Sequence, residues 1–387
     1  MSGGVVQLVA TGDQDAWLTG KPEVSFFRSN YKRYTHYASS VERQVIQGTP
    51  MAGGISTVRF EKKGDLVNYV YFTARDSAGA LVPTVDWTQV INKVELLIGG
   101  QVIDTHDFTY STSIEPVTGA QSYNQRSLAT NTGNFQYPTN AICPFYALKF
   151  FFCKDWSVSL PLVALQMHDV ELRITWGGLS GTPSASPTAY SSLQYICWTN
   201  FVYLDQSERD YFAKQTPIDL LITQVQRTLV PQSATTTSFE VALAQPVKFL
   251  AFSCSHYGNQ YNTDNGSGTV ASTWQLKTQV NGVDVGEFKH LPQWVDVPQY
   301  YHTPYGYLPN GKDTRTPTVG IISYCLDTSK LQPTGTLNFS RIDTYRIVVP
   351  TTTANGVKDL LTSTYLYAVN YNVLRIQKGL GSLLYAN

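Results

Sequence analysis

The chain has 387 residues, more than one hydrophobic core usually serves, so we expect two domains. Its 28 Lys and Arg residues balance 28 Asp and Glu residues, and a neutral chain has no overall field that would draw it to DNA, RNA or anionic lipid. Charged residues are only 14% of the chain, against roughly 25% in an ordinary soluble domain. This low charge indicates that much of the surface does not face water.

The N-terminal stretch WLTGKPEVSFFRSNYKRY (17–34) mixes five aromatic with four basic residues. Such a mixture can hold a single nucleic-acid strand by stacking and charge. Residues 1–40, however, have a net charge of only +1, and Gly20 and Pro22 interrupt any long amphipathic helix that could lie on a membrane. We therefore interpret residues 1–39 as an arm that packs on protein. Its candidate contact residues are Trp17, Phe26, Phe27, Arg28, Tyr31, Arg33 and Tyr34.

The sequence lacks the patterns of a secreted or membrane protein. No basic region precedes an apolar run at the start, and no window offers 18 consecutive apolar residues, so we expect neither a signal peptide nor a membrane span. The five cysteines are odd in number, widely spaced and never in a C-x-x-C pair, as is typical of buried thiols in a reduced compartment. The glycosylation sequons at Asn265 and Asn338 therefore carry little weight.

After the arm, short runs rich in Val, Ile, Phe, Tyr and Thr alternate with clusters of Gly, Pro, Asn and Ser, which predicts an all-β protein. Two hairpins are nearly explicit, because Gly99-Gly100 and Asn281-Gly282 are dipeptides that accept the positive φ of type I′ turns. The second turn pairs Val280 with Val283 and continues to Val285 on a face that we expect to be buried.

Five segments recur in the same order at offsets of 172 to 182 residues, which indicates a duplicated domain. The pairs begin at Thr57 and Thr237, at Val67 and Val247, at the two hairpin turns, near Leu165 and Leu337, and at Leu193 and Tyr365. Each copy has about eight strand-like runs, the number found in a jelly roll. We expect the longest irregular segments at 110–142 and 286–320.

The two copies meet at DQSERDYFAKQTPIDLL, where Ser207 and Asp210 form a capping-box pattern that predicts a short helix. Pro217 ends this helix, and the second copy starts near Thr223. The predicted organisation is an N-terminal arm (1–39), a first jelly roll (40–212), a linker (213–222) and a second jelly roll (223–387).

Three motifs in this chain are similar to those of one known family. The opening GGVVQLVATGDQDAWLTGKPEVSFFRSNYKRYTHYA resembles the start of the major capsid proteins of nucleocytoplasmic large DNA viruses, and LPLVALQMHDVELRI and FVYLDQSERDYFA resemble two further signatures of that family. Lys21 stands where the family commonly has Asn, and TPIDLLI replaces a stretch that usually contains His-Glu-Tyr.

This resemblance implies a double jelly roll, homotrimers of pseudo-hexagonal outline, and tiling of these capsomers into an icosahedral shell around an inner membrane and double-stranded DNA. It further implies a location in the virion, assembly in the host cytoplasm, and minor capsid proteins as partners, without direct contact with nucleic acid.

Residue patterns for catalysis or cofactor binding are lacking in the sequence. The six histidines form no H-x-H, no H-E-x-x-H and no pair at i, i+4, so we expect no catalytic residue, no metal and no cofactor. His168 and Asp169 adjoin in a run that reads as a strand, where neighbours point to opposite faces and cannot act together.

A carbohydrate-binding protein made of two β-sandwiches is the alternative function. Aromatic faces stack on sugars, and QYYHTPYGYLP offers Tyr300, Tyr301, Tyr305 and Tyr307. The same stretch could be a loop, stiffened by Tyr and Pro, that packs against a neighbouring subunit. A catalytic function ranks third because the sequence lacks a convergent set of titratable groups.

Overall fold

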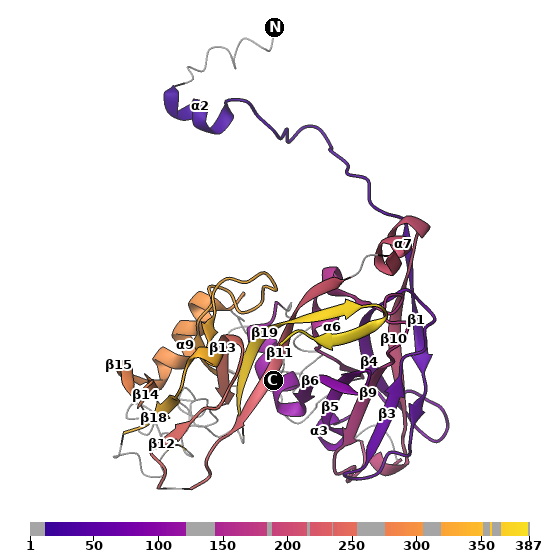
Figure 1. Cartoon of the computed structure of the whole chain (residues 1–387). Coiled ribbons are helices and arrows are strands. Elements are labelled where there is room, and N and C mark those ends of the chain that lie inside the picture. The colour runs from indigo at the N-terminus through magenta and orange to yellow at the C-terminus, as the bar shows by residue number, and fades with distance from the viewer. Residues whose placement is uncertain are drawn as a thin grey trace. The chain divides into compact units, whose positions relative to one another are not determined.

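The structure is a computed structural model, and it describes residues 12–120, 144–183, 188–214, 217–233, 235–253, 275–304, 319–350, 357 and 365–385. The chain divides into two compact units, Met1–His36 and Tyr37–Asn387. The first unit has one helix, α2 (Asp13–Thr19), among its described residues. The second unit contains all the described strands (Figure 1). Its first strand starts at Tyr37, so the last three residues of the predicted arm lie in a strand.

The first roll consists of two antiparallel sheets packed face to face. One has the strand order β1-β10-β4-β7, with β8 beside β4, and the other has the order β2-β3-β9-β5-β6. The strands are β1 (Tyr37–Gln44), β2 (Ile46–Gln47), β3 (Ile55–Arg59), β4 (Leu66–Arg75), β5 (Ile91–Ile98), β6 (Gln101–Asp107), β7 (Tyr146–Ala147), β8 (Leu160–Pro161), β9 (Val170–Trp176) and β10 (Gln194–Leu204). Between them lie α3 (Trp87–Val90), the π-helical turn η1 (Tyr110–Ile114), α4 (Glu115–Thr118), α6 (Phe151–Lys154), and the 3-10 turns η2 (Trp156–Val158) and η3 (Tyr190–Ser192).

The second roll repeats this plan. Its sheets have the orders β11-β19-β13-β16, with β17 beside β13 and β20 beside β19, and β12-β18-β14-β15. The strands are β11 (Ile218–Leu229), β12 (Ser238–Glu240), β13 (Pro246–Ser253), β14 (Gln275–Val280), β15 (Val283–His290), β16 (Val319–Ser323), β17 (Leu337–Asn338), β18 (Tyr345–Val348), β19 (Tyr365–Gln377) and β20 (Leu380–Leu383). Its helical segments are α9 (Leu291–His302) and the 3-10 turn η6 (Phe339–Arg341), and α7 (Gln206–Lys214) joins the two rolls.

The two rolls match strand for strand, which confirms the predicted double jelly roll. Read along each sheet, β1, β10, β4 and β7 correspond to β11, β19, β13 and β16. In the facing sheets, β3, β9, β5 and β6 correspond to β12, β18, β14 and β15. Each of the five recurring sequence segments lies in or beside a pair of corresponding strands. The short strands β2, β8, β17 and β20 are additions to the eight in each roll.

Both predicted hairpin turns occupy corresponding places, between β5 and β6 and between β14 and β15. The residues of both turns have positive φ, 57° and 82° at Gly99-Gly100 and 49° and 79° at Asn281-Gly282. Val280 pairs with Val283 as expected. The face that these valines share was wrongly expected to be buried, since Val283 is 69% and Val285 53% exposed. They lie in β15, an edge strand whose eight residues are all exposed.

Several helical segments differ from the sequence-based expectation. The segments expected to be irregular contain η1 and α4 in the first roll and the twelve-residue α9 in the second. The backbone N–H of His290 donates to Gln293 Oε1 at 2.9 Å and so caps α9. The junction helix is capped by Asp205 rather than by Ser207, because the Asp205 carbonyl accepts the first helical bond from Arg209 at 2.9 Å. Strand β11 then begins at Ile218, inside the range predicted as a linker.

Apolar side chains from both rolls pack together at their junction. Tyr110 and Ile114, on η1 of the first roll, form one cluster with residues of the second roll, including Phe249 and Ala251 on β13 and Tyr367 on β19. A second group, Ile218, Ile222, Leu374 and Ile376 at the ends of β11 and β19, joins the core of the first roll. The two rolls therefore share part of their apolar interior and form one body.

Buried carboxylates on β6 fix how β11 and β19 lie against the first roll. Asp104 Oδ1 accepts a hydrogen bond from the Val225 backbone N–H at 2.9 Å. Asp107 Oδ2 accepts from the Tyr367 hydroxyl at 2.7 Å and lies 3.3 Å from Arg227 Nη1. Because a buried carboxylate is costly without partners, these bonds set the position of the second roll along β6.

A buried lysine adds a second polar link at the junction. Lys248 on β13 is buried, and its Nζ donates to the carbonyls of Thr328 at 3.1 Å and Lys330 at 2.8 Å. The Thr328 hydroxyl in turn donates to the carbonyl of Thr118 in the first roll at 2.8 Å. Burial lowers the pKa of Lys248 to about 8.

We expect Asp107→Ala to lower the free energy of unfolding by about 3 kcal/mol, because it removes the acceptor of Tyr367 and the ion-pair partner of Arg227. The matched control is Asp219→Ala, which breaks a bidentate but half-exposed pair with Arg375. This control should cost less than about 1 kcal/mol. Urea unfolding followed by tryptophan fluorescence measures both, and equal losses would contradict a special role for the β6 carboxylate.

The Lys248 pKa predicts a pH dependence of stability. Since its folded pKa of about 8 lies below its ordinary value of 10.5, the unfolded chain binds more protons between these pH values, and the stability of the fold rises with pH across that window. Relative to Lys248→Met, which does not titrate, the wild-type free energy of unfolding should increase by about 3 kcal/mol from below pH 8 to about pH 10.5. Denaturant titrations at several pH values measure this difference, and a constant difference would refute it.

Candidate assembly surfaces

The residues predicted as an assembly arm all lie in the first unit and are solvent-exposed. The aromatic side chains Trp17, Phe26, Phe27, Tyr31 and Tyr34 are between 83% and 96% exposed, and Arg28 and Arg33 are exposed as well. Trp17 lies on α2, and the other members follow in a stretch without helix or strand, in which Phe26 and Phe27 lie in a turn. So many exposed aromatic rings form a surface that would be stabilised by contact with another apolar surface.

The turn after α2 explains why Asn is the better residue at the position that Lys21 occupies in this chain. Lys21 has a φ of 56°, in the left-handed region where Asn is far more common than Lys. The Asn that the family commonly has at this position would adopt this conformation with less strain. Lys21 therefore retains the family's turn at a small cost in backbone energy.

A second exposed apolar surface lies on β15 and α9 of the second roll. Besides Val283 and Val285 on β15, the helix exposes Val297, Tyr300 and Tyr301, the last two by 80% and 70%. The rings of Tyr300 and Tyr301 meet edge to face, with centroids 4.8 Å apart. These two tyrosines, considered above for sugar binding, lie on a helix rather than a loop, and Tyr305 and Tyr307 lie outside the described residues.

A third exposed apolar surface lies on the β1-β10-β4-β7 sheet of the first roll. Val41 on β1 is 39% exposed, and Val45 just after it is 62% exposed. Tyr69 on β4 is 37% exposed, and its ring stacks on that of Tyr71, which stacks in turn on Trp198. Sequence reasoning missed these residues, although aromatic side chains at alternate positions of VNYVYFTAR already indicated a second apolar face.

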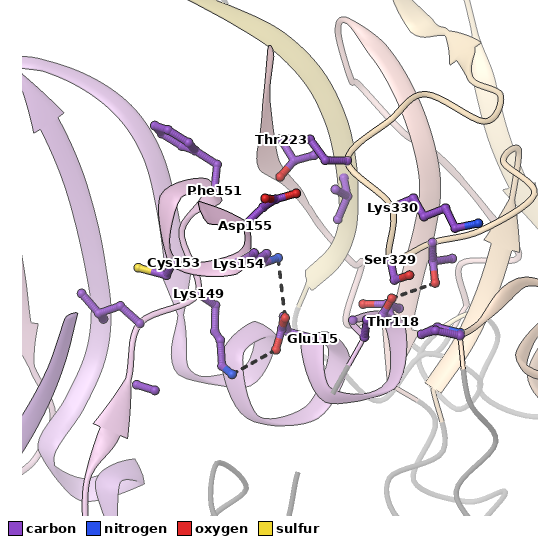
Figure 2. A pocket seen from close by; sticks show the side chains of 18 of the residues that line it. Glu115, Thr118, Lys149, Phe151, Cys153, Lys154, Asp155, Thr223, Ser329 and Lys330 are labelled. Atoms are coloured by element: carbon purple, nitrogen blue, oxygen red, sulfur yellow. Dashed lines mark hydrogen bonds and ion pairs between the residues drawn. The ribbon is translucent and has the colours of Figure 1, made fainter. Parts of the chain in front are cut away.

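A cavity of about 1210 Å³ opens between the two rolls (Figure 2). Its first-roll wall carries Glu115, whose carboxylate lies 3.5 Å from Lys149 Nζ and 3.7 Å from Lys154 Nζ. Burial on its own raises the pKa of Glu115, but the two ammonium groups outweigh it and the pKa lies below its usual value. Lys248 lines the second-roll wall with its ammonium bound to two carbonyls.

The groups in this cavity are arranged for structure rather than for catalysis. Burial raises the pKa of the Cys153 thiol to about 12, so the thiol stays protonated and unreactive at neutral pH. The charge of the Glu115 carboxylate is balanced by Lys149 and Lys154. The Lys248 ammonium donates its hydrogen bonds to two backbone carbonyls. Within the described ranges, no three His, Cys, Asp or Glu side chains gather into a group that could hold a metal ion.

Two of the histidines that the structure describes, His106 and His168, have structural partners. His106 Nε2 lies 2.9 Å from Asp104 Oδ2 at the junction. His168 was expected in a strand, but β9 starts only at Val170, and His168 Nδ1 lies 3.1 Å from the carbonyl of Gly381 in the C-terminal hairpin. Its neighbour Asp169 pairs with Arg59 at 2.6 Å. His256, Cys143, Cys254 and Asn265 lie outside the described residues.

Comparison with known proteins gives one consistent result. Residues 25–205 match the family described as major capsid protein N-terminus, and residues 208–382 match the family of the large eukaryotic DNA virus major capsid protein. Over the whole of both chains, the sequence is 31% identical to the major capsid protein of Paramecium bursaria Chlorella virus 1 and 30% identical to that of Pyramimonas orientalis virus.

Solved structures agree with the sequence matches. A quasi-atomic structure of the PBCV-1 virus capsid superposes with a TM-score of 0.71 at 25% identity, over 94% of this chain and 100% of that one. The Faustovirus major capsid protein has the same fold, with a TM-score of 0.55 at 11% identity over 95% of this chain and 94% of that one. The chain therefore belongs to the major capsid proteins of large eukaryotic DNA viruses and is a structural component of the virion capsid.

Proposed function

We propose that three copies of this chain associate into a capsomer of pseudo-hexagonal outline and that such capsomers tile an icosahedral shell. The observation that carries this proposal is the rigid junction between the two rolls, at which Asp104, Asp107 and Lys248 are buried and bonded. Each of the two similar rolls in one chain forms one corner of the capsomer. Three chains around a threefold axis therefore give an outline with six corners.

The chemistry of the surface supports association. Only 14% of the residues are charged, and exposed aromatic and aliphatic side chains gather on the arm, on β15 with α9, and on β1 with β4. Interface cores are enriched in aromatic residues and depleted in charge. A monomer would leave these surfaces in water, which is unfavourable.

The arm is proposed to tie neighbouring subunits together. Transferring a fully exposed Phe into a contact is worth roughly 1.5–3 kcal/mol, and Phe26 and Phe27 are each 96% exposed. The aromatic members supply this gain, while Arg28 and Arg33 pair with carboxylates at the subunit boundary. The net charge of +1 over residues 1–40 gives little support to a nucleic-acid contact.

The remaining parts of the proposal follow from family membership. We assign the arm to residues 1–36 rather than 1–39, because β1 begins at Tyr37, and we start the second roll at residue 218 rather than 223, because β11 begins at Ile218. Minor capsid proteins are the expected partners besides the chain itself, the capsomer lies close to an inner viral membrane, and assembly takes place in the host cytoplasm. None of the described helices is long and apolar enough to cross a membrane.

Light scattering on the purified chain tests the capsomer. Three copies of the 43.0 kDa chain give about 129 kDa, and this species should persist at micromolar concentration. Negative-stain electron microscopy should show particles of six-cornered outline. A monomer that does not associate on concentration would refute the proposal.

Removal of residues 1–36 tests the arm. We expect the truncated chain to keep the thermal unfolding transition of both rolls, because the described residues of this segment are exposed, but to enter virions at least several-fold less than a tagged full-length chain in infected cells. Quantitative mass spectrometry of purified virions measures incorporation.

Point variants separate packing from charge in the arm. Phe26→Ser with Phe27→Ser should reproduce most of the loss, whereas Arg28→Gln with Arg33→Gln should have the smaller effect, since exposed ion pairs are worth only about 0–1 kcal/mol. The opposite order would show that the arm binds through its charge rather than through aromatic packing.

A further inference from the structure

The cavity between the two rolls is large enough to hold a small organic molecule. Its volume of about 1210 Å³ exceeds the roughly 300–1,000 Å³ that is usual for ligand pockets. Its walls come from both rolls, with β4, α4 and α6 on one side and β11, β13 and the segment 327–332 on the other. A molecule in this cavity would therefore contact both rolls at their junction.

The side chains that line the cavity carry an excess of positive charge. Among the described residues, Glu115 is the one carboxylate at ion-pair distance from Lys149 and Lys154, so it balances only one of the two ammonium groups. On the other wall, the buried Lys248 bonds to backbone carbonyls, which have no net charge. The described lining has four lysines and three carboxylates, a net charge of +1, namely Lys149, Lys154, Lys248 and Lys330 against Glu115, Asp155 and Asp327.

The two ammonium groups beside Glu115 are only loosely bound. Each lysine ammonium has three N–H donors. Their contacts to the Glu115 carboxylate are 3.5 and 3.7 Å long, whereas strong charge-assisted hydrogen bonds measure roughly 2.7–2.9 Å. Figure 2 shows both ammonium groups directed at Glu115 from the first-roll wall. Because the Lys149 side chain is only 13% exposed, water solvates it little, and an anion in the cavity would provide the acceptors that Glu115 does not.

The Lys248 ammonium on the second-roll wall adds to the positive potential of the cavity. Burial is the main cause that lowers the pKa of Lys248, and the positive charge of Lys154 lowers it further, although Cys325 and Asp327 act in the opposite direction. Like charges repel strongly where little water separates them. An anion held near Lys154 would reduce this repulsion.

The remainder of the lining is largely aromatic. The rings of Tyr71 and Phe145 meet edge to face with centroids 5.9 Å apart, and Tyr110, Phe151 and Phe249 line the cavity as well. Apolar groups gain free energy when they leave water for such surroundings. The molecule that suits this cavity therefore has an apolar body in addition to an anionic group.

We propose that the cavity binds a small amphipathic carboxylate, with the carboxylate group beside Lys149 and Lys154 and the apolar body along Tyr71 and Phe145. One negative charge is sufficient, because the lining has an excess of one positive charge. Since the ligand contacts both rolls, its binding stabilises their junction, and the free energy of unfolding rises with ligand concentration. The site lies inside one chain, so it does not depend on how copies associate.

Isothermal titration calorimetry on the purified full-length chain tests the class of ligand. Decanoate, kept below the concentration at which it forms micelles, should bind at one site per chain. Decanol has a similar body without the charge, and acetate has the charge without the body, so each should bind about tenfold or more weakly than decanoate. Failure of decanoate to bind would refute the proposal. Equal affinity for decanol would refute the role of the lysines, and equal affinity for acetate would refute the role of the aromatic lining.

A lysine variant tests the position of the carboxylate. Lys149→Met removes one ammonium group but keeps a long side chain, and it should weaken decanoate binding about tenfold while leaving decanol binding unchanged. The matched control is Lys214→Met, because the Lys214 side chain is 75% exposed on α7 and does not line the cavity. This control should bind decanoate as the wild type does. Equal effects of the two variants would contradict the assignment of the carboxylate to Lys149.

Photolabelling locates the site in the wild-type chain. A decanoate that carries a diazirine near the end of its chain loses N₂ on illumination, and the carbene that forms inserts into a neighbouring C–H, N–H or O–H bond. Mass spectrometry should find the label within residues 69–71, 145–155 or 327–332, and an excess of decanoate should suppress it. Labels confined to residues 12–36 or to β15 and α9 would mean that decanoate binds only to exposed apolar surfaces. That result would overturn the proposal even if Lys149→Met failed to fold.

Discussion

The buried carboxylates on β6 are the constraint on which the rest of the structure depends. A carboxylate removed from water must be met by donors, and Asp104 and Asp107 find theirs on β11 and β19 of the other roll. Apolar packing between Tyr110 and Phe249 would tolerate small sliding movements, whereas a hydrogen bond of 2.7 Å does not. The carboxylates therefore set the register of the two rolls, and the apolar cluster supplies attraction without direction.

Local signals predicted the individual strands and hairpin turns. The alternation in VELRITW places Val170, Leu172, Ile174 and Trp176 in the core, as the period of a strand requires, and the dipeptides at both hairpins take the positive φ that they favour. Comparison of the two halves of the chain then supplied the long-range order that no single strand reveals. The helix α9 was missed because its cap uses a backbone N–H and Gln293, a pattern without the usual Ser, Thr or Asp.

The candidate surfaces were harder to predict because periodicity does not say what a face is buried against. Alternating valines on β15 have the pattern of a core strand, yet Val283 and Val285 point away from the described part of their own chain. Nothing in QVIDTHDF distinguishes Asp107 from a surface carboxylate until Tyr367, 260 positions later, is seen to donate to it. The assembly role of the arm stays a prediction, and in the sequence it rests on the density of aromatic residues in 17–34.

Strands β6 and β15 occupy corresponding places in the two rolls but differ in chemistry, since β6 carries buried carboxylates and β15 carries exposed valines. Within a chain the second roll is tethered to the first, so its effective concentration is high and the contact can include polar bonds that add direction but little net free energy. A contact between separate chains must also overcome the loss of translational and rotational freedom. Apolar side chains such as those of β15 and α9 give more free energy for the area they bury. After duplication the two rolls diverged here, so the chain has a fixed polar joint at β6 and an exposed edge with apolar side chains at β15.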